Sequence, residues 1–203
     1  GEDGHTDRDL KMLPDGNLLI TVRDGLRVID LAGNTVAEVS AADAGVGGFH
    51  HDGVRLPGGG YLTLTSEQRE VDVPALGGMV RARGDIVLEL DEGGREVWRW
   101  SCFDHLDTTR YPTALSRTPD QRTGVYDWTH ANAVVYLEED DSILLSLRHQ
   151  NQVIKIDRGT GDVTWRLGRD GDFVLENLDP AVGNTWFFSQ HAPDMAADGT
   201  SLI

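Results

Sequence analysis

The residues of this chain that are best suited to chemistry are histidines that recur at similar places. Four of them stand a few positions ahead of a turn that opens an apolar strand: His5, His51, His130 and His191. Histidine titrates nearest to neutral pH, so it serves readily as nucleophile, acid, base or metal ligand. A repeated fold that superimposes these positions would gather the imidazoles around one axis. The recurrence therefore makes the chain an enzyme candidate.

The densest polar cluster surrounds the third of these histidines. It runs Asp-Trp-Thr-His-Ala-Asn over residues 127–132 and continues as Ser-Leu-Arg-His-Gln over residues 146–150. Arg148 brings a planar fork of N–H donors, which suits two oxygens of a tetrahedral anion. The neighbouring His149 would follow Arg148 on a strand and point to the opposite face, so we expect it to serve packing. His5 and His105 are expected to lie on loops and receive no role.

A repeat of short strands must position these residues. Each unit has a glycine- or aspartate-rich turn with an apolar strand (residues 16–22, 60–65 and 142–147), then a hairpin (26–39, 86–100 and 153–166). Runs of this kind between Gly and Asp turns predict antiparallel strands. Three aspartates end the same strand in each copy and are expected to bond the turn backbone: Asp30, Asp91 and Asp157. Helical periodicity is absent.

The spacing of the units predicts an all-β fold, a β-propeller present as an open arc. The turns at Gly16 and Gly59 are 43 residues apart, close to the ~40–50 residues of a four-stranded blade. The interval from Gly59 to Asp141 is 82 residues, which we interpret as one blade with insertions at 71–83 and 101–126. The predicted blades are residues 1–45, 46–126 and 127–185, with an incomplete fourth at 186–203. Both ends look like cuts within a longer protein.

Composition excludes some partners. The net charge is -16, from 34 acidic and 18 basic residues, and nucleic acid is excluded because phosphate binding needs a positive face. Lys11 and Lys155 are the only lysines. This acidic, lysine-poor composition fits a salt-adapted source and fits equally well an acidic protein from a high-GC genome. Cys102 stands alone, so no intrachain disulfide can form, and no stretch approaches the ~20 apolar residues of a membrane span.

The motifs taken together resemble the bacterial arylsulfate sulfotransferase family. The resemblance rests on the segments 127–132 and 146–150 with the Asp-Asp turn between them. His-His-Asp at 50–52 precedes them and Gln-His-Ala-Pro at 190–193 follows, in the order that the family shows. It covers residues 49–203, with 1–40 as the preceding blade. It implies a β-propeller enzyme that moves a sulfuryl group from a phenolic sulfate ester to a phenol, without a nucleotide donor or other cofactor, outside the cytoplasm.

The resemblance also implies roles for individual residues. His191 would be the nucleophile, transiently sulfated on nitrogen, with His51, His130 and Arg148 around the sulfate. Asn132 would help to position them. The adjacent His50 leaves the first assignment open, and we prefer His51 because its eight-residue spacing to Gly59 equals that of His191 to Gly199.

The aromatic residues divide into two groups. Trp128 and Phe187 are candidates for the wall of an aromatic substrate pocket, and packing inside the fold is an equal alternative for them. The remaining tryptophans are expected to pack in the core or between blades: Trp98, Trp100, Trp165 and Trp186.

Two other classes of function fit parts of the pattern. Convergent histidines could bind zinc with an open position, as in a metal-dependent hydrolase. Arg148 argues against a metal there, because a cation beside a dication is unfavourable. The second alternative is a propeller without enzymatic activity that binds a partner on its rim.

Overall fold

The fold is all-β. The structure, a computed structural model, describes residues 9–176, 185–196 and 201–202. Within that part of the chain the one α-helix, α1 (Cys102–His105), is a single turn of four residues. Among the described residues this agrees with the absence of helical periodicity in the sequence. The described residues include no helix long and apolar enough to cross a membrane.

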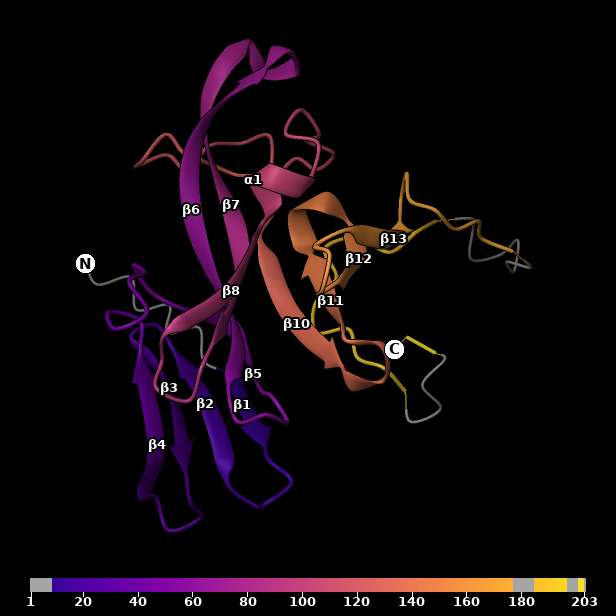
Figure 1. Cartoon of the computed structure of the whole chain (residues 1–203). Helices are drawn as coiled ribbons and strands as arrows, with labels where there is room; N and C mark the ends of the chain where they lie inside the picture. The colour runs from indigo at the N-terminus through magenta and orange to yellow at the C-terminus, as the bar shows by residue number, and fades with distance from the viewer. Residues whose placement is uncertain (1–8, 177–184, 197–200, 203) are drawn as a thin grey trace. The chain divides into compact units, whose positions relative to one another are not determined.

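The strands form three antiparallel sheets in chain order, none of them closed (Figure 1). The first sheet contains β1 (Asp9–Met12), β2 (Leu18–Val22), β3 (Gly25–Ile29) and β4 (Thr35–Ser40). The second contains β5 (His50–Arg55), β6 (Tyr61–Val73), β7 (Gly78–Leu90) and β8 (Glu96–Ser101). The third contains β10 (Ala131–Leu137), β11 (Ser142–Leu147), β12 (Gln152–Asp157) and β13 (Val163–Gly168). A short strand, β9 (Tyr126–Asp127), pairs in parallel with β7.

Each sheet has one strand more than the predicted unit of a strand and a hairpin. The added strand comes first, as β1, β5 and β10, and pairs with the apolar strand that follows the turn. In the second and third sheets this strand is where the histidines lie. His50 and His51 begin β5, and His130 directly precedes β10.

The three repeated aspartates act as turn residues, as predicted. Oδ1 of Asp30 accepts hydrogen bonds from the backbone N–H of Ala32 and Asn34, at 2.9 and 2.8 Å. Oδ1 of Asp91 accepts from Gly93 and Arg95 in the same way. Oδ1 of Asp157 accepts from Thr160 at 2.8 Å. These carboxylates satisfy turn N–H groups that have no strand partner.

The segment predicted as an insertion, residues 71–83, consists mainly of strand residues. Figure 1 shows β6 and β7 as one long twisted hairpin that continues through this region. The chain reverses through a 3₁₀ turn, η1 (Pro74–Leu76), and through Gly77, whose φ of 98° only glycine adopts easily. The residues before η1 alternate between partly buried and exposed, as strand residues should, but most are polar. The second predicted insertion, 101–126, does consist mainly of turns around α1.

The chain divides into two compact units, Gly1–Glu67 with Asp85–Asp104, and Gln68–Gly84 with His105–Ile203. In the first unit one apolar core joins the first sheet to the inner part of the second, and it includes Leu19, Leu26, Val39, Leu88 and Leu90. Gly53 on β5 lies so close to the first sheet that a Cβ there would meet Thr21 Oγ1 at 2.5 Å. Only glycine fits this contact without displacing the neighbouring strand.

The second unit is built around the third sheet. Every residue of its strand β11 is buried, from Ser142 to Leu147. Such a continuous buried run, rather than an alternating one, is the pattern of a central strand covered on both faces. The strand ends at a 3₁₀ turn, η3 (Arg148–Gln150), which holds the arginine singled out in the sequence.

Candidate active site

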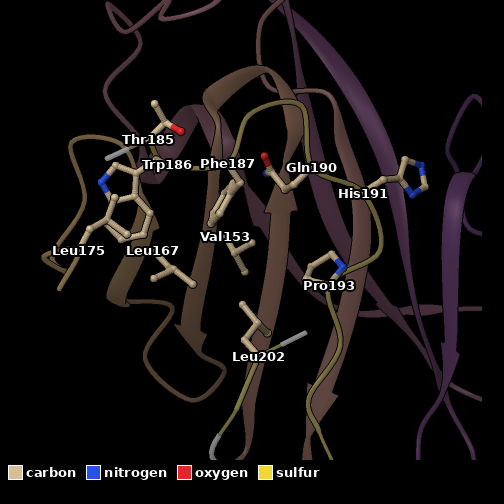
Figure 2. Close-up of a pocket in the computed structure, with 10 residues that line it drawn as sticks. All are labelled: Val153, Leu167, Leu175, Thr185, Trp186, Phe187, Gln190, His191, Pro193 and Leu202. Carbon is tan, nitrogen blue, oxygen red and sulfur yellow. The ribbon is translucent and has the colours of Figure 1, made fainter. Parts of the chain in front are cut away.

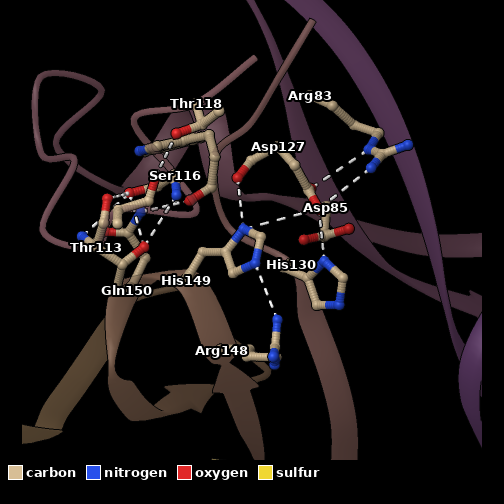
Figure 3. A network of polar contacts seen from close by, with 12 residues as sticks. Arg83, Asp85, Thr113, Ser116, Thr118, Asp127, His130, Arg148, His149 and Gln150 are labelled. Carbon is tan, nitrogen blue, oxygen red and sulfur yellow. Dashed lines mark hydrogen bonds and ion pairs between the residues drawn. The ribbon is translucent and has the colours of Figure 1, made fainter. Parts of the chain in front are cut away.

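The clearest polar cluster of the second unit contains Asp127, His130, Arg148 and His149 (Figure 3). It forms where two segments of the chain run side by side. The N–H of Arg148 donates to the carbonyl of His130 at 3.2 Å, and the N–H of His149 donates to that of Thr129 at 3.1 Å. The predicted pair of His130 and Arg148 therefore comes together, as parts of one backbone-bonded corner.

The position of Asp127 is fixed by the long hairpin. Asp127 is the second residue of β9 and lies opposite Arg83 of β7. The next residue, Trp128, donates its N–H to the carbonyl of Arg83 at 3.0 Å. Trp128 itself is buried, and its indole N–H donates to the carbonyl of Arg110 at 2.9 Å. The indole therefore anchors this corner from inside the fold.

Arg110 holds the same corner together through its contacts with Gln150. Its guanidinium donates to both the carbonyl and the side-chain oxygen of Gln150, at 2.8 and 2.9 Å. The amide of Gln150 in turn donates to the carbonyl of Trp128 at 2.7 Å. These bonds tie the segment before His130 to the turn that carries Arg148.

Backbone conformation marks the positions of two histidines as special. His130 has φ of 49° and His51 has φ of 55°, in the left-handed region that non-glycine residues seldom adopt. Both lie beside an irregular register at the start of a first strand: between His50 and Gly53 in one sheet and between Ala131 and Ala133 in the other. Bulges and strained residues of this kind cluster at functional sites.

The Asp127 carboxylate orients His130. Nδ1 of His130 donates to Oδ2 of Asp127 at 2.5 Å, and Arg83 approaches the same carboxylate at 3.2 Å. Burial alone would raise the pKa of Asp127, but the hydrogen bond from His130 and the charge of Arg83 hold it well below its ordinary value. Asp127 is therefore an anion at neutral pH.

His149 lies on the other side of the same residue. Its Nδ1 lies 2.6 Å from the backbone carbonyl of Asp127, and its Nε2 lies 3.2 Å from a guanidinium nitrogen of Arg148. The two imidazoles of His130 and His149 are stacked, with centroids 4.4 Å apart. Burial lowers the pKa of His149 below its ordinary value, and the positive charges of His130 and Arg148 act in the same direction. The hydrogen bond to the Asp127 carbonyl and the charge of Asp127 oppose this shift without cancelling it.

This placement corrects the expectation for His149. The residue is buried, but it does not point to the opposite face of a strand. Arg148 and His149 belong to η3 rather than to β11, so the alternation of a strand does not apply, and the imidazole contacts His130 and Arg148. The roles of Asp127 and His149 were missed at the level of sequence. The sequence did hold a signal for the contact between Asp127 and His130, because the spacing Asp-x-x-His can place both side chains in one turn.

The segment that carries His191 is joined to β10, the strand that begins directly after His130. Asn132 of β10 donates its side-chain N–H to the carbonyl of Gln190 at 2.7 Å. The amide of Gln190 donates to the carbonyl of Gln152 at 2.8 Å, and the N–H of Ser189 donates to Asn151 Oδ1 at 2.9 Å. Asn132 therefore contacts the residue directly before the predicted nucleophile.

A pocket of about 440 Å³ lies beside this segment (Figure 2). Its lining is mostly apolar and comes from β12, β13 and the C-terminal segment: Val153, Leu167, Leu175, Thr185, Trp186, Phe187, Gln190, His191, Pro193 and Leu202. Phe187 thus lines this pocket, whereas Trp128 is not among its lining residues. Trp186, expected to pack, is also at this surface. In Figure 2 the imidazole of His191 points away from Trp186 and Phe187.

The remaining predicted residues lie in the first unit. Nδ1 of His50 is 3.0 Å from Nδ1 of His51, and Nε2 of His50 is 3.3 Å from the buried carboxylate of Asp85. His50 is thus placed between Asp85 and His51. That His51 shares a site with His130, Arg148 and His191 stays a prediction.

A metal ion does not fit the cluster well. Asp127, His130 and His149 do bring one ligand atom each within 4.8 Å of one another. Both nitrogens of His149 already have hydrogen-bond partners, however, and two arginines contact the group. A dication would have to displace Arg148 from His149 and would be repelled by Arg83, so the two arginines disfavour a metal ion here.

Comparison with known proteins identifies the class. The chain matches the arylsulfotransferase (ASST) family over residues 2–203 and belongs to that family. No curated protein matches the chain significantly. One solved structure that it resembles is a protein of unknown function from Bacteroides caccae, with 12% identity and a TM-score of 0.36. The match covers 83% of this chain and 63% of that one.

Proposed function

We propose that the protein transfers a sulfuryl group from a phenolic sulfate ester to a phenolic acceptor. Membership of the arylsulfotransferase family supports this activity. The observation that carries it on the structural side is the corner formed by Asp127, His130, His149 and Arg148. It presents one oriented imidazole and one guanidinium on adjoining backbone, which are the groups that an anionic ester requires.

The reaction needs positioned donors rather than elaborate covalent machinery. Sulfuryl transfer resembles phosphoryl transfer, with a loose transition state and negative charge on the equatorial oxygens. The two-pronged guanidinium of Arg148 matches two such oxygens. Preorganised donors of this kind are typically worth 10²- to 10³-fold in rate, roughly 3–4 kcal/mol.

We propose that His191 is the nucleophile. Its neutral imidazole attacks sulfur, an N–S bond forms, and the S–O bond to the aryl group breaks. The leaving phenolate takes a proton from Nε2 of a protonated His130, whose Nδ1–H stays bonded to Asp127. The acceptor phenol then gives its proton back to His130 and attacks sulfur, and the N–S bond breaks. The process divides one difficult step into two easier ones.

The same proposal extends to the fold and to the remaining residues. The three sheets act as consecutive blades of a β-propeller, with His50 and His51 at the start of β5 and His130 directly before β10. His51 then completes the sulfate site, with His50 orienting it. Phe187 contributes to the aryl-binding wall. Trp128, being buried, supports the site from behind.

The decisive test traps the intermediate. The protein is mixed with an aryl sulfate in the absence of an acceptor and is quenched under alkaline conditions, which preserve the N–S bond of a sulfated histidine. The digested protein is then analysed by peptide mass spectrometry. We expect a sulfated peptide that contains His191 and no such peptide from His191→Ala, which should lose turnover. Normal turnover by His191→Ala would eliminate the covalent mechanism. Absence of aryl sulfate cleavage by the unmodified protein would eliminate the activity itself.

A further inference from the structure

The hydrogen bonds of His149 determine its protonation state. The backbone carbonyl of Asp127 can only accept, so Nδ1 of His149 must carry a proton. The guanidinium of Arg148 can only donate, so Nε2 must carry a lone pair. The buried imidazole is thus neutral and in one defined tautomer. It is a fixed acceptor for one of the N–H groups of Arg148.

A neutral imidazole is an unusual hydrogen-bond acceptor for an arginine side chain. Arginine side chains are most often held by carboxylates, which would neutralise part of the charge that an anionic substrate needs. A neutral imidazole holds the guanidinium without cancelling its charge. The stacked ring of His130 limits the motion of the imidazole on one face, and the bond to Asp127 ties it to the residue that orients His130.

We propose that His149 is a positioning residue for Arg148, holding the guanidinium in the sulfate-binding orientation while neutral and releasing it when protonated. This rests on the proposed function for its catalytic consequence. An imidazolium has no lone pair to offer at Nε2, and its charge would repel the guanidinium. The charged and titratable groups that face His149 are Asp127, His130 and Arg148.

The proposal predicts a pH effect with a definite sign. Because burial lowers the pKa of His149 below the ordinary value of 6.5, the imidazole is neutral at pH 7 and becomes charged only in more acidic solution. Positioning of Arg148 should therefore be intact at neutral pH and fail as the pH falls through the lowered pKa of His149.

Two substitutions separate the bonds that His149 makes. In His149→Asn the amide N–H can replace Nδ1–H on the Asp127 carbonyl, but nothing reaches Arg148. In His149→Gln the longer amide can offer its oxygen to Arg148 near the position of Nε2. We expect His149→Asn to lower kcat/KM by roughly 10- to 100-fold, as for loss of a hydrogen bond to a charged group, with a nearly unchanged Tm. His149→Gln should lose less and should shift the acidic limb of the kcat/KM profile to lower pH. His105→Gln, at the exposed last residue of α1, serves as the control.

A second measurement does not depend on catalysis. Nitrogen-15 NMR of the imidazoles should show His149 with a proton on Nδ1 and none on Nε2 at pH 7. Arg148→Ala should then move the Nε2 signal toward that of an unbonded nitrogen. A protonated Nε2 at pH 7 would overturn the inference whether or not the protein turns over aryl sulfates. The inference would also be overturned if the two His149 variants lost kcat/KM equally and in proportion to their loss of Tm. An unchanged acidic limb of the kcat/KM profile in His149→Gln would overturn it as well.

Discussion

Asp127 binds two stacked histidines through different atoms. Its carboxylate accepts the Nδ1–H of His130, and its backbone carbonyl accepts the Nδ1–H of His149. Both imidazoles therefore have the same tautomer when neutral and direct Nε2 away from Asp127. One of them continues to Arg148. A single residue thus fixes the direction of both rings, and through His149 it influences the guanidinium.

Replacing the Asp127 carboxylate should impair turnover more than folding. Asp127→Asn offers an amide that can donate to His130, which favours the wrong tautomer of the ring. We expect kcat to fall by roughly 10²- to 10⁴-fold, the range for lost acid–base assistance. Asp162→Asn, an exposed change of the same charge, is the matched control. Equal activity of the two variants in an aryl sulfate assay would contradict the role of Asp127.

The same carboxylate should contribute to the acid stability of the fold. Its pKa is depressed in the folded protein, so its stabilising effect is fully present above the ordinary value of 3.8 and is lost as the pH falls below it. The difference in free energy of unfolding between the unmodified protein and Asp127→Asn should therefore shrink from pH 7 to pH 3. Urea denaturation at the two pH values measures this. A difference that grows in acid would be the contrary result.

Arg148→Lys should show that geometry matters beyond charge. Lysine keeps the positive charge but cannot present two parallel N–H groups to one sulfate, nor reach His149 in the same way. We expect kcat/KM to fall by roughly 10²- to 10³-fold. Arg95→Lys, at an exposed turn of the second sheet, should leave kcat/KM unchanged. A loss of less than about threefold in Arg148→Lys would argue that only the charge is used.

Tyr111→Phe should stabilise the protein. The hydroxyl of Tyr111 is buried and has no hydrogen-bond partner among the described residues, so removing it should raise the free energy of unfolding by about 1 kcal/mol. Burial also raises the pKa of Tyr111 to about 12 from 10.0, so the unmodified protein should lose stability as the pH rises from 10 to 12, and the variant should lose less. Tyr136→Phe is the contrast, since its hydroxyl bonds Asp141. Thermal unfolding at pH 8 and 11 provides the comparison.

Gly53→Ala should destabilise the packing of the first unit. The added methyl would meet Thr21 Oγ1 at 2.5 Å and Leu26 Cδ2 at 2.9 Å, so we expect a loss of about 1–3 kcal/mol in urea denaturation. Gly58→Ala has open space around its Cβ and should change stability by less than about 0.5 kcal/mol. Similar values for the two variants would show that β5 can move away from the first sheet at little cost.

The repeated strands and turns were predictable because their signals are local. Asp157 and the apolar run of β11 needed only turn chemistry and hydrophobicity. The hairpin at residues 71–83 was missed because its strands are polar, so alternation in burial is not visible as alternation in hydrophobicity. His130 and Arg148 were found as a pair through their motif. The contacts of His149 depend on a 3₁₀ turn at the end of β11. Side chains in this turn do not alternate between two faces as they would in a strand, and no pattern of residue types predicts the turn.

The parallel pairing of β9 with β7 connects the candidate site to the hairpin formed by β6 and β7. The Trp128 amide is bonded to the Arg83 carbonyl, so the strand that holds Asp127 cannot shift without straining β7. Slow fluctuation of the hairpin would then be transmitted to His130. Hydrogen–deuterium exchange at the Trp128 amide reports directly on how often this connection opens, and a ligand that clamps the hairpin would tune turnover without touching a reacting atom.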